Sequence, residues 1–546
     1  MRKVESQEKI VAGCVNASAS PIRYGSRIGR SVACLASATL LVACSAHAWA
    51  KDADEAHTAN ATHHSKAKPT KGNAPKLKLP REDRPAELKG APAYVTTPAI
   101  PYFAPDASAA DINKRLGYHG YITPFPTFAD SVLGNDQGWR SALANQGFGI
   151  LMSNREVMYS NLLNTPKSVP STFPACGPND ARRGSMCAGN QIYTGQSPFW
   201  LSESTATLTY DTGRWGVPDG LIAVAGTWNA TNYERGLTPN TFRMSLLSWY
   251  QTAFVRKMEI ELGYLRLAYE FMGTTVGGSY AAVFGPTAAL TGIMGLGNSQ
   301  EAAPAARFTW HFDDHFYNQF AVQRSMPVND QYPVYISEQL NNPTGFDFTS
   351  PVRGTRAVFV NEFGYRQEAV PGTLRTWLRV GGMYNNSAFR DLSKPGATTD
   401  GYGLYALGDW QLWQQDPSSP GTAYRGIYVG GTYTYVPEKV SAFSQYFEGR
   451  VYWMGPTAAR ARDMFSVVYT HNDISKYFAN PINAASYVSG ISAANWVNSV
   501  TASYTARLSA GTYLTAGLSY VDRPSIAYFQ KEGSALLFQG ALLVYF

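Results

Sequence analysis

Charged and aromatic side chains alternate with apolar ones between residues 374 and 380. Arg375, Trp377 and Arg379 fall on one face of an extended chain, opposite leucine and valine. Guanidinium groups at fixed positions donate strong hydrogen bonds, and an indole ring packs against the apolar face of a ring-shaped solute. The pattern therefore predicts a surface that binds an uncharged polar solute, and it requires no nucleophile.

Four other segments place charged or polar side chains on one face in the same way. Their members are Glu259 and Glu261, Arg307 and His311, Glu362 and Arg366, and Asp409 and Gln411. If these faces meet around one opening, they form a ring of both charge signs that hydrogen-bonds hydroxyl groups and discriminates against ions. The alternative is that the charges only pair with one another and brace a wall, and the sequence leaves both interpretations open.

Two histidine motifs invite other chemistry. His311 and His315 have a spacing that binds metal on a helix, but here it straddles a turn, so we expect the histidines to solvate that turn. His471 lies near Asp473, as in a hydrolase, yet no serine sits in a nucleophile-elbow sequence. We therefore expect no catalytic residue, no metal and no cofactor.

The elements that position these residues repeat with a period of two, which indicates β-strands. Polar and apolar side chains alternate in residues 307–312, 427–435, 465–470, 500–508, 513–520 and 536–546. The strands have about the length that a tilted transmembrane strand needs, aromatic residues gather at their ends, and the chain ends on an apolar strand at Phe546. These features predict an all-β fold, a transmembrane antiparallel β-barrel of the bacterial outer membrane.

The composition is compatible with a β-strand protein, and it argues against a helical membrane protein and against a nucleic-acid-binding protein. The chain is 45% hydrophobic but has a mean hydropathy of -0.22, which argues against a helical membrane protein. Residues 280–297 are mostly apolar, but Pro286 and several glycines favour a loop folded against the barrel. The net charge of +7 belongs to residues 1–95, and the rest is neutral, so no nucleic-acid partner is expected.

The first 115 residues are predicted to lie outside the barrel. Residues 1–50 resemble a signal peptide, with Cys44 as the lipidated residue of a lipoprotein in an alternative interpretation. Residues 51–115 are rich in Lys, Pro and Ala and are expected to be a disordered periplasmic linker, in which residues 51–95 could contact peptidoglycan. The barrel is expected to occupy residues 116–546.

Two cysteines remain after removal of the leader. Cys176 and Cys187 lie in a polar stretch with Pro and Gly, and export favours a loop disulfide between them. Two unpaired thiols are the alternative.

Several spaced motifs in residues 140–546 resemble the carbohydrate-selective porins of the OprB type. The central ones run from Pro304 to Val322 and from Glu362 to Asn385. The flanking positions are Gly263, Phe271 and Phe284 before them, and Gly403, Tyr405, Asp409, Arg425, Gly426, Arg462 and Asp463 after them. The resemblance implies a 16-stranded outer-membrane barrel with a narrow pore for small carbohydrate solutes, in contact with outer-membrane lipids. The terminal strand resembles the signal that the barrel-assembly machinery reads.

Three positions depart from that family pattern. Tyr264 replaces a basic residue, Ser519 replaces a glutamine, and a glutamate is missing near Ser499. These departures bear on solute selectivity and not on the barrel. They keep open an alternative function in polysaccharide export or envelope organisation, and a barrel enzyme is a third hypothesis.

Overall fold

The computed structural model describes residues 102–119, 131–163, 193, 195–232, 242–272, 290–297, 301–329, 338, 341–350, 352–529 and 533–546. Contacts divide the chain into Met1–Pro92 and Ala93–Phe546, and every described residue belongs to the second unit. The predicted signal peptide, Cys44, residues 51–95 and both Cys176 and Cys187 lie outside the described residues, and they remain predictions.

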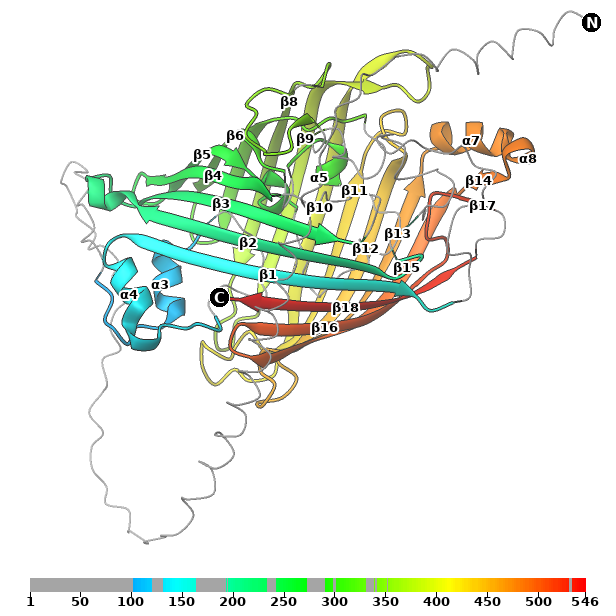
Figure 1. Ribbon diagram of the computed structural model, residues 1–546. Coiled ribbons are helices and arrows are strands. Elements are labelled where there is room, and N and C mark those ends of the chain that lie inside the picture. The colour runs from blue at the N-terminus through cyan, green and yellow to red at the C-terminus, as the bar shows by residue number, and fades with distance from the viewer. Residues whose placement is uncertain are drawn as a thin grey trace, which may run out of the picture. The chain divides into compact units, whose positions relative to one another are not determined.

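Sixteen antiparallel strands close into a barrel (Figure 1), as the resemblance implied. The wall strands are β1 (Phe148–Asn161), β2 (Phe199–Asp211), β3 (Gly220–Thr231), β4 (Phe242–Ala253), β5 (Met258–Leu265), β6 (Ala303–His311), β7 (Phe316–Arg324), β8 (Ala357–Gln367), β9 (Thr376–Arg390), β10 (Thr398–Gln414), β11 (Gly426–Tyr435), β12 (Phe443–Met454), β13 (Met464–Ile474), β15 (Trp496–Ser509), β16 (Thr512–Val521) and β18 (Ala535–Tyr545). Neighbours in the wall are neighbours in the chain, and β1 closes the ring on β18 with Val157 opposite Ala541.

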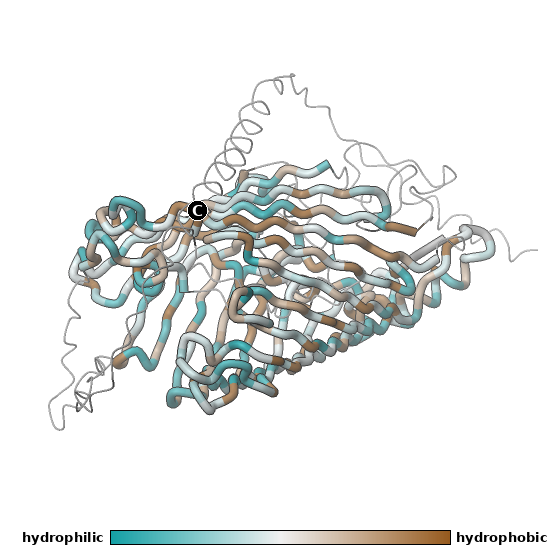
Figure 2. Tube along the Cα trace, turned by 90° about the horizontal axis from the view of Figure 1, so that it is seen from below, coloured by the Kyte–Doolittle hydropathy of each residue, from teal (hydrophilic) through white to brown (hydrophobic). Residues whose placement is uncertain are grey.

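The burial pattern is the reverse of that in a soluble protein. On β16, the apolar Leu514 and Leu518 are 41% and 46% exposed, whereas Thr515 and Ser519, which directly follow them, are buried. Hydropathy alternates in the same way along the wall strands (Figure 2). The apolar face therefore points outward, toward lipid, and the polar face points inward. No helix in the described part of the chain is long and apolar enough to cross a membrane.

The two ends of the barrel differ in their connections. Residues 254–257, 312–315 and 510–511 are short turns at one end, which we name the short-turn end. The connections at the other end include residues 266–302, 325–356 and 475–495. The last of these is partly helical, because Ser475 caps the helix α7 (Lys476–Ala484) by accepting a hydrogen bond from the Tyr477 amide.

The remaining elements are short. They are α3 (Ala109–Leu116), α4 (Trp139–Ala144), α5 (Leu290–Ile293), α8 (Ser486–Ser489), the 3₁₀ turns η2 (Asp136–Gly138), η4 (Thr212–Trp215) and η5 (Leu267–Tyr269), and the strand pair β14 (Ile491–Ala493) and β17 (Ala527–Phe529).

The folded chain begins earlier than we predicted. The sequence places residues 102–115 in the linker, yet they include most of α3, which lies beside α4 and the ends of β1 and β2 (Figure 1). Ser108 caps α3, and Ile112 and Leu116, one helical turn apart, are buried. The polar composition of the whole stretch concealed this short apolar face.

One connection leaves the wall and folds inward. The chain turns away after Leu265, and Leu267, Phe271, Leu290 and Met294 are fully buried. Asn385 on β9 donates to the Met294 carbonyl at 2.8 Å, so residues 290–297 lie against the inner wall, as predicted for this segment. Where β5 has ended, the Met244 amide of β4 bonds instead to the Thr344 carbonyl at 2.9 Å.

Candidate functional site

Glu362 on β8 lies at the centre of one buried cluster on the inner wall. Tyr317 from β7 and Tyr405 from β10 donate to its two carboxylate oxygens at 3.0 and 2.8 Å, and Arg379 from β9 is 3.8 Å away. Burial of the carboxylate is compensated by these donors and by the guanidinium charge. The cluster therefore locks four adjacent strands together.

Two glycines create the room for these tyrosines. A Cβ atom on Gly364 would lie 2.1 Å from the Tyr317 ring, and one on Gly381 would lie 2.3 Å from the Tyr405 ring. No side chain fits at such distances, so both rings lie across glycine on a neighbouring strand to reach Glu362. This is the physical reason for two of the glycines in the motif from 362 to 385.

Trp377 is enclosed by two guanidinium groups. The Arg379 Cζ atom lies 4.0 Å from the ring centroid and the Arg366 Cζ atom lies 5.2 Å from it. The indole nitrogen donates to the Tyr317 hydroxyl at 3.3 Å, and the side chain is only 4% exposed. Cation–π contacts of this kind stabilise the wall, and they occupy the ring that we expected to stack on a solute.

Arg307 on β6 contacts three glutamate side chains at a second cluster. It lies 3.0 Å from Glu261, 3.0 Å from Glu270 and 3.8 Å from Glu259. Burial raises the pKa of Glu270 to about 8, against the lowering effect of Arg307. The Tyr118 hydroxyl donates to Glu270 at 2.9 Å, which ties the segment after α3 to the inward-folded connection.

Asp409 on β10 anchors a third cluster. Arg450 from β12 binds it through two nitrogens at 2.6 and 2.8 Å, and Tyr452 donates to it at 3.1 Å. Arg450 also donates to Glu448 at 2.7 Å. A Cβ atom on Gly430 would lie 2.2 Å from the Asp409 carboxylate, so glycine on the intervening strand again makes the contact possible.

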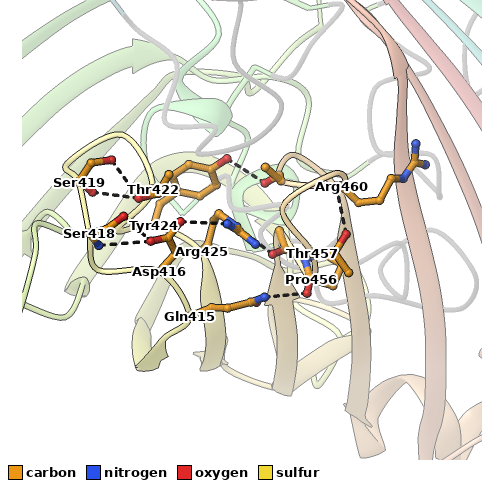
Figure 3. A network of polar contacts seen from close by, with 12 residues as sticks. Gln415, Asp416, Ser418, Ser419, Thr422, Tyr424, Arg425, Pro456, Thr457 and Arg460 are labelled. Atoms are coloured by element: carbon orange, nitrogen blue, oxygen red, sulfur yellow. Dashed lines mark hydrogen bonds and ion pairs between the residues drawn. The ribbon is translucent and has the colours of Figure 1, made fainter. Parts of the chain in front are cut away.

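Gln411 is held by the turns at the short-turn end. Its amide donates to the Ala423 carbonyl at 2.8 Å and its oxygen accepts from the Arg375 backbone amide at 3.1 Å. The turn that carries Ala423 is fastened by Arg425, which bonds to Asp416 and to the Gly455 carbonyl (Figure 3). Gln411 therefore has a structural role in the turn.

The wall formed by β13, β15 and β16 carries hydroxyl groups in place of charges. Ser499 pairs with Thr470 at 2.6 Å, and Ser519 accepts from Thr501 at 2.8 Å. These serines stand where the resemblance led us to expect glutamate and glutamine. The paired hydroxyls therefore leave positions 499 and 519 without a carboxylate or a carboxamide.

The sequence model of the carbohydrate-selective porin family, OprB, matches residues 180–538. The chain belongs to this family. The high-pH structure of Pseudomonas putida OprB is similar in fold, with a TM-score of 0.59, 13% identity, and coverage of 77% of this chain and 100% of that one. A triple mutant of the Rhodopseudomonas blastica porin has a TM-score of 0.38 and 8% identity, with coverage of 73% of this chain and 100% of that one. No curated protein matches the sequence.

The porin is a passive channel of the bacterial outer membrane for carbohydrates, and its family and fold indicate a channel rather than an enzyme. His471, which we weighed as a catalytic residue, lies 2.7 Å from Asn498 and 3.1 Å from Asp473. His311 contacts Glu259, and His315 contacts the Arg366 carbonyl, so the two rings have different partners.

Burial divides the ten residues that we predicted to line the pore of the porin. Seven of them are at most 7% exposed: Glu261, Arg307, Glu362, Trp377, Arg379, Asp409 and Gln411. The side chains of Glu259, Arg366 and Arg375 are 25%, 48% and 19% exposed. All three lie toward the short-turn end, where Glu368 joins them as a partner of both arginines.

Some residues of the clusters escaped prediction. Glu448 and Arg450 follow the same alternation as residues 375–379, between Tyr446 and Tyr452, so the pattern was present in the sequence. Glu270 lies outside every strand, and no periodicity marks it. Glu368 lies just after β8, and its pKa is lowered by Arg366 and Arg375, although partial burial opposes that effect.

Proposed function

We propose that the porin selects small neutral carbohydrates with five side chains at its short-turn end, which we name the mouth group. They are Glu259, His311, Arg366, Glu368 and Arg375. The observation that carries the proposal is the contrast in exposure between these side chains and the buried clusters above them. Only a side chain that meets water can exchange hydrogen bonds with a hydrated solute.

The charges of the mouth group suit a neutral solute. Two carboxylates, two guanidinium groups and one histidine lie on β5, β6 and β8 and in the turn from β8 to β9, so neither ion sign is favoured as a whole. Charged donors and acceptors form the strongest hydrogen bonds to hydroxyl groups. In this proposal the buried clusters hold the wall rigid and the mouth group discriminates between solutes.

Single-channel conductance of the refolded porin in a planar bilayer tests the proposal. Glucose, maltose and, for comparison, the anion succinate are each added in increasing concentration while the conductance is recorded. Arg375→Ala is the test variant and Arg460→Ala is the control. Arg460 carries the same charge in a turn at the same end, bound to Asp463. We expect neutral sugars to block the channel, and Arg375→Ala alone to weaken that block.

Two results would contradict the proposal. If Arg375→Ala and Arg460→Ala weaken the block by sugar equally, the block depends only on the net charge at this end of the barrel. Large conductance steps indifferent to every sugar would remove selectivity altogether, and export or envelope organisation would then become the better hypothesis.

We propose in addition that the barrel-assembly machinery recognises the end of β18 at Phe546. In support, the Phe546 amide donates to the Met152 carbonyl of β1 at 2.9 Å, so the last residue lies at the seam that closes the barrel. Deletion of Phe546 is expected to lower the amount of barrel in the outer membrane, whereas Phe546→Tyr is expected to preserve it.

We also propose that residues 51–95 contact peptidoglycan, on the ground of their basic, proline-rich sequence. Co-sedimentation of the full chain with purified peptidoglycan, compared with a chain lacking residues 51–95, tests this contact. Equal sedimentation of both would refute it.

A further inference from the structure

The chain reaches the inner face of the barrel wall at the end of α3. The Leu116 carbonyl accepts a hydrogen bond from the Thr209 hydroxyl of β2. A Cβ atom on Gly149 of β1 would lie 2.6 Å from the same carbonyl oxygen, so only glycine allows this approach. Leu116 also belongs to one buried apolar cluster with Leu221 of β3. Because Gly149, Thr209 and Leu221 are on the inward faces of their strands, the end of α3 lies against the inside of the wall.

Two further contacts fix the direction in which the chain leaves α3. Arg115 in the last turn of the helix forms an ion pair with Asp211 of β2 at 2.9 Å, and the Asp211 side chain is only 3% exposed. Gly117 then ends the helix. Its amide donates to the Asn113 carbonyl at 2.8 Å, and a Cβ atom on Gly117 would lie 2.3 Å from that oxygen. The chain therefore turns off the helix at a position that a larger residue does not fit.

Tyr118 fastens the segment farther along the inner wall. Its hydroxyl donates to Glu270 at 2.9 Å, and Arg307 of β6 lies 3.0 Å from the same side chain. The segment after α3 thus extends from the inner face of β1 and β2 to a partner of β6. We name residues 117–119 the ledge.

His119 presents its ring to water inside this end of the barrel. The ring lies against that of Tyr250 on β4, with 5.0 Å between the centroids and 34° between the planes. Tyr250 faces inward, because Leu221 and Glu261, its partners on the two neighbouring strands, are buried on the inner face. The His119 side chain is exposed even though its neighbour belongs to the inner wall.

The ledge provides an aromatic surface that the buried clusters do not. Trp377, which we expected to stack on a solute, is 4% exposed and enclosed by two guanidinium groups. Tyr317 and Tyr405 are buried against a carboxylate. His119, by contrast, is exposed, and Glu259 of the mouth group interacts with it electrostatically. An aromatic face beside charged hydrogen-bonding groups suits a sugar, whose ring has an apolar face and a rim of hydroxyl groups.

We propose that the ledge narrows the pore at the short-turn end and that the His119 imidazole stacks on the apolar face of a passing carbohydrate. The stacking rests on the proposed function, in which the mouth group binds the hydroxyl groups of the same solute. Arg115, Gly117 and Tyr118 are positioning residues that hold His119 in place. A segment that precedes the first strand of the wall then contributes to solute selectivity.

Thiol labelling during single-channel recording tests the position of the ledge. His119→Cys is compared with Ser418→Cys, an exposed position in a turn at the same end (Figure 3), and the wild-type chain gives the background from its own cysteines. A negatively charged methanethiosulfonate reagent is added, and mass spectrometry verifies the modification. We expect a stepwise loss of conductance with His119→Cys alone. No labelling of His119→Cys, labelling without a change in conductance, or an equal loss with Ser418→Cys would overturn the proposal.

Titration with glucose tests the stacking. His119→Ala is expected to raise the glucose concentration at half-block about threefold to tenfold, which corresponds to the loss of one aromatic contact. His119→Phe retains an aromatic face and is expected to remain within about twofold of the wild type. If His119→Ala has no effect while Arg375→Ala still weakens the block, or if both His119 variants lose it equally, the stacking is refuted and the mouth group stands. If no sugar blocks the wild-type channel, the proposed function and the stacking fail together, and the labelling decides on the ledge alone.

Discussion

Alanine at position 381 is expected to break the bond between Tyr405 and Glu362. Its Cβ would lie 2.3 Å from the Tyr405 Cζ and 2.5 Å from the hydroxyl, so the ring must move. The hydroxyl bond to a buried carboxylate, 2.8 Å long, is then lost. A hydrogen bond to a charged group contributes about 1.5–3 kcal/mol, and leaving the carboxylate without that donor adds to the cost. We therefore expect Gly381→Ala to lower the free energy of unfolding by at least about 2 kcal/mol.

The adjacent glycine is a matched control. A Cβ on Gly382 points outward, where its nearest neighbour is the end of the flexible Leu404 side chain at 3.3 Å. Urea titration of the porin folded in lipid vesicles, followed by tryptophan fluorescence, measures both variants. Gly382→Ala is expected to change the free energy of unfolding little.

A double-mutant cycle isolates the clash. In a Tyr405→Ala background the ring is absent, so Gly381→Ala should cost much less than it does in the wild type. The reasoning is refuted if Gly381→Ala destabilises both backgrounds equally, or if it matches Gly382→Ala.

Three further predictions follow from the clusters and the outer face. Arg450→Ala leaves Asp409 and Glu448 buried without their cation, and we expect a loss of about 3–5 kcal/mol in the same urea titration. Burial raises the Glu270 pKa from 4.5 to about 8. The protonated group therefore contributes stability that is fully present below pH 4.5 and is lost as the pH rises through 8. Glu270→Gln should flatten the pH dependence of the unfolding midpoint between these two pH values. Leu518→Arg places a charge on the lipid face and is expected to cost about 2–4 kcal/mol in vesicles, whereas Leu518→Ile should cost far less.

The alternation of polar and apolar residues predicted where the strands lie and which side chains point inward. Residues 513–520 and 536–546 correspond to β16 and β18, with Leu514 and Leu518 on the outer face. Period two is a local property, so one sequence contains it. The number of strands came from the family resemblance.

The alternation did not predict how deeply each inward side chain is buried. Glu362 is inaccessible because Tyr317 and Tyr405, each more than 40 residues away in the chain, close over it across two glycines. The Trp377 ring is covered because the guanidinium group of Arg366, on the preceding strand, lies against it. Such contacts depend on register between strands, which the alternation within one strand does not specify.

The short β5 has a consequence for the order in which the wall assembles. Most contacts between strands join hairpins that are close in sequence, so those parts of the wall can zip together locally. Beyond Leu247, the edge of β4 has no partner in β5 and bonds to Thr344 instead. Thr344 follows Leu247 by about 100 residues, and β5, β6 and β7 lie between them in the chain. Closing so long a loop costs more entropy than forming a hairpin. Besides the seam between β1 and β18, this place in the described wall is therefore expected to form late, and a nascent barrel should expose its lateral opening there first.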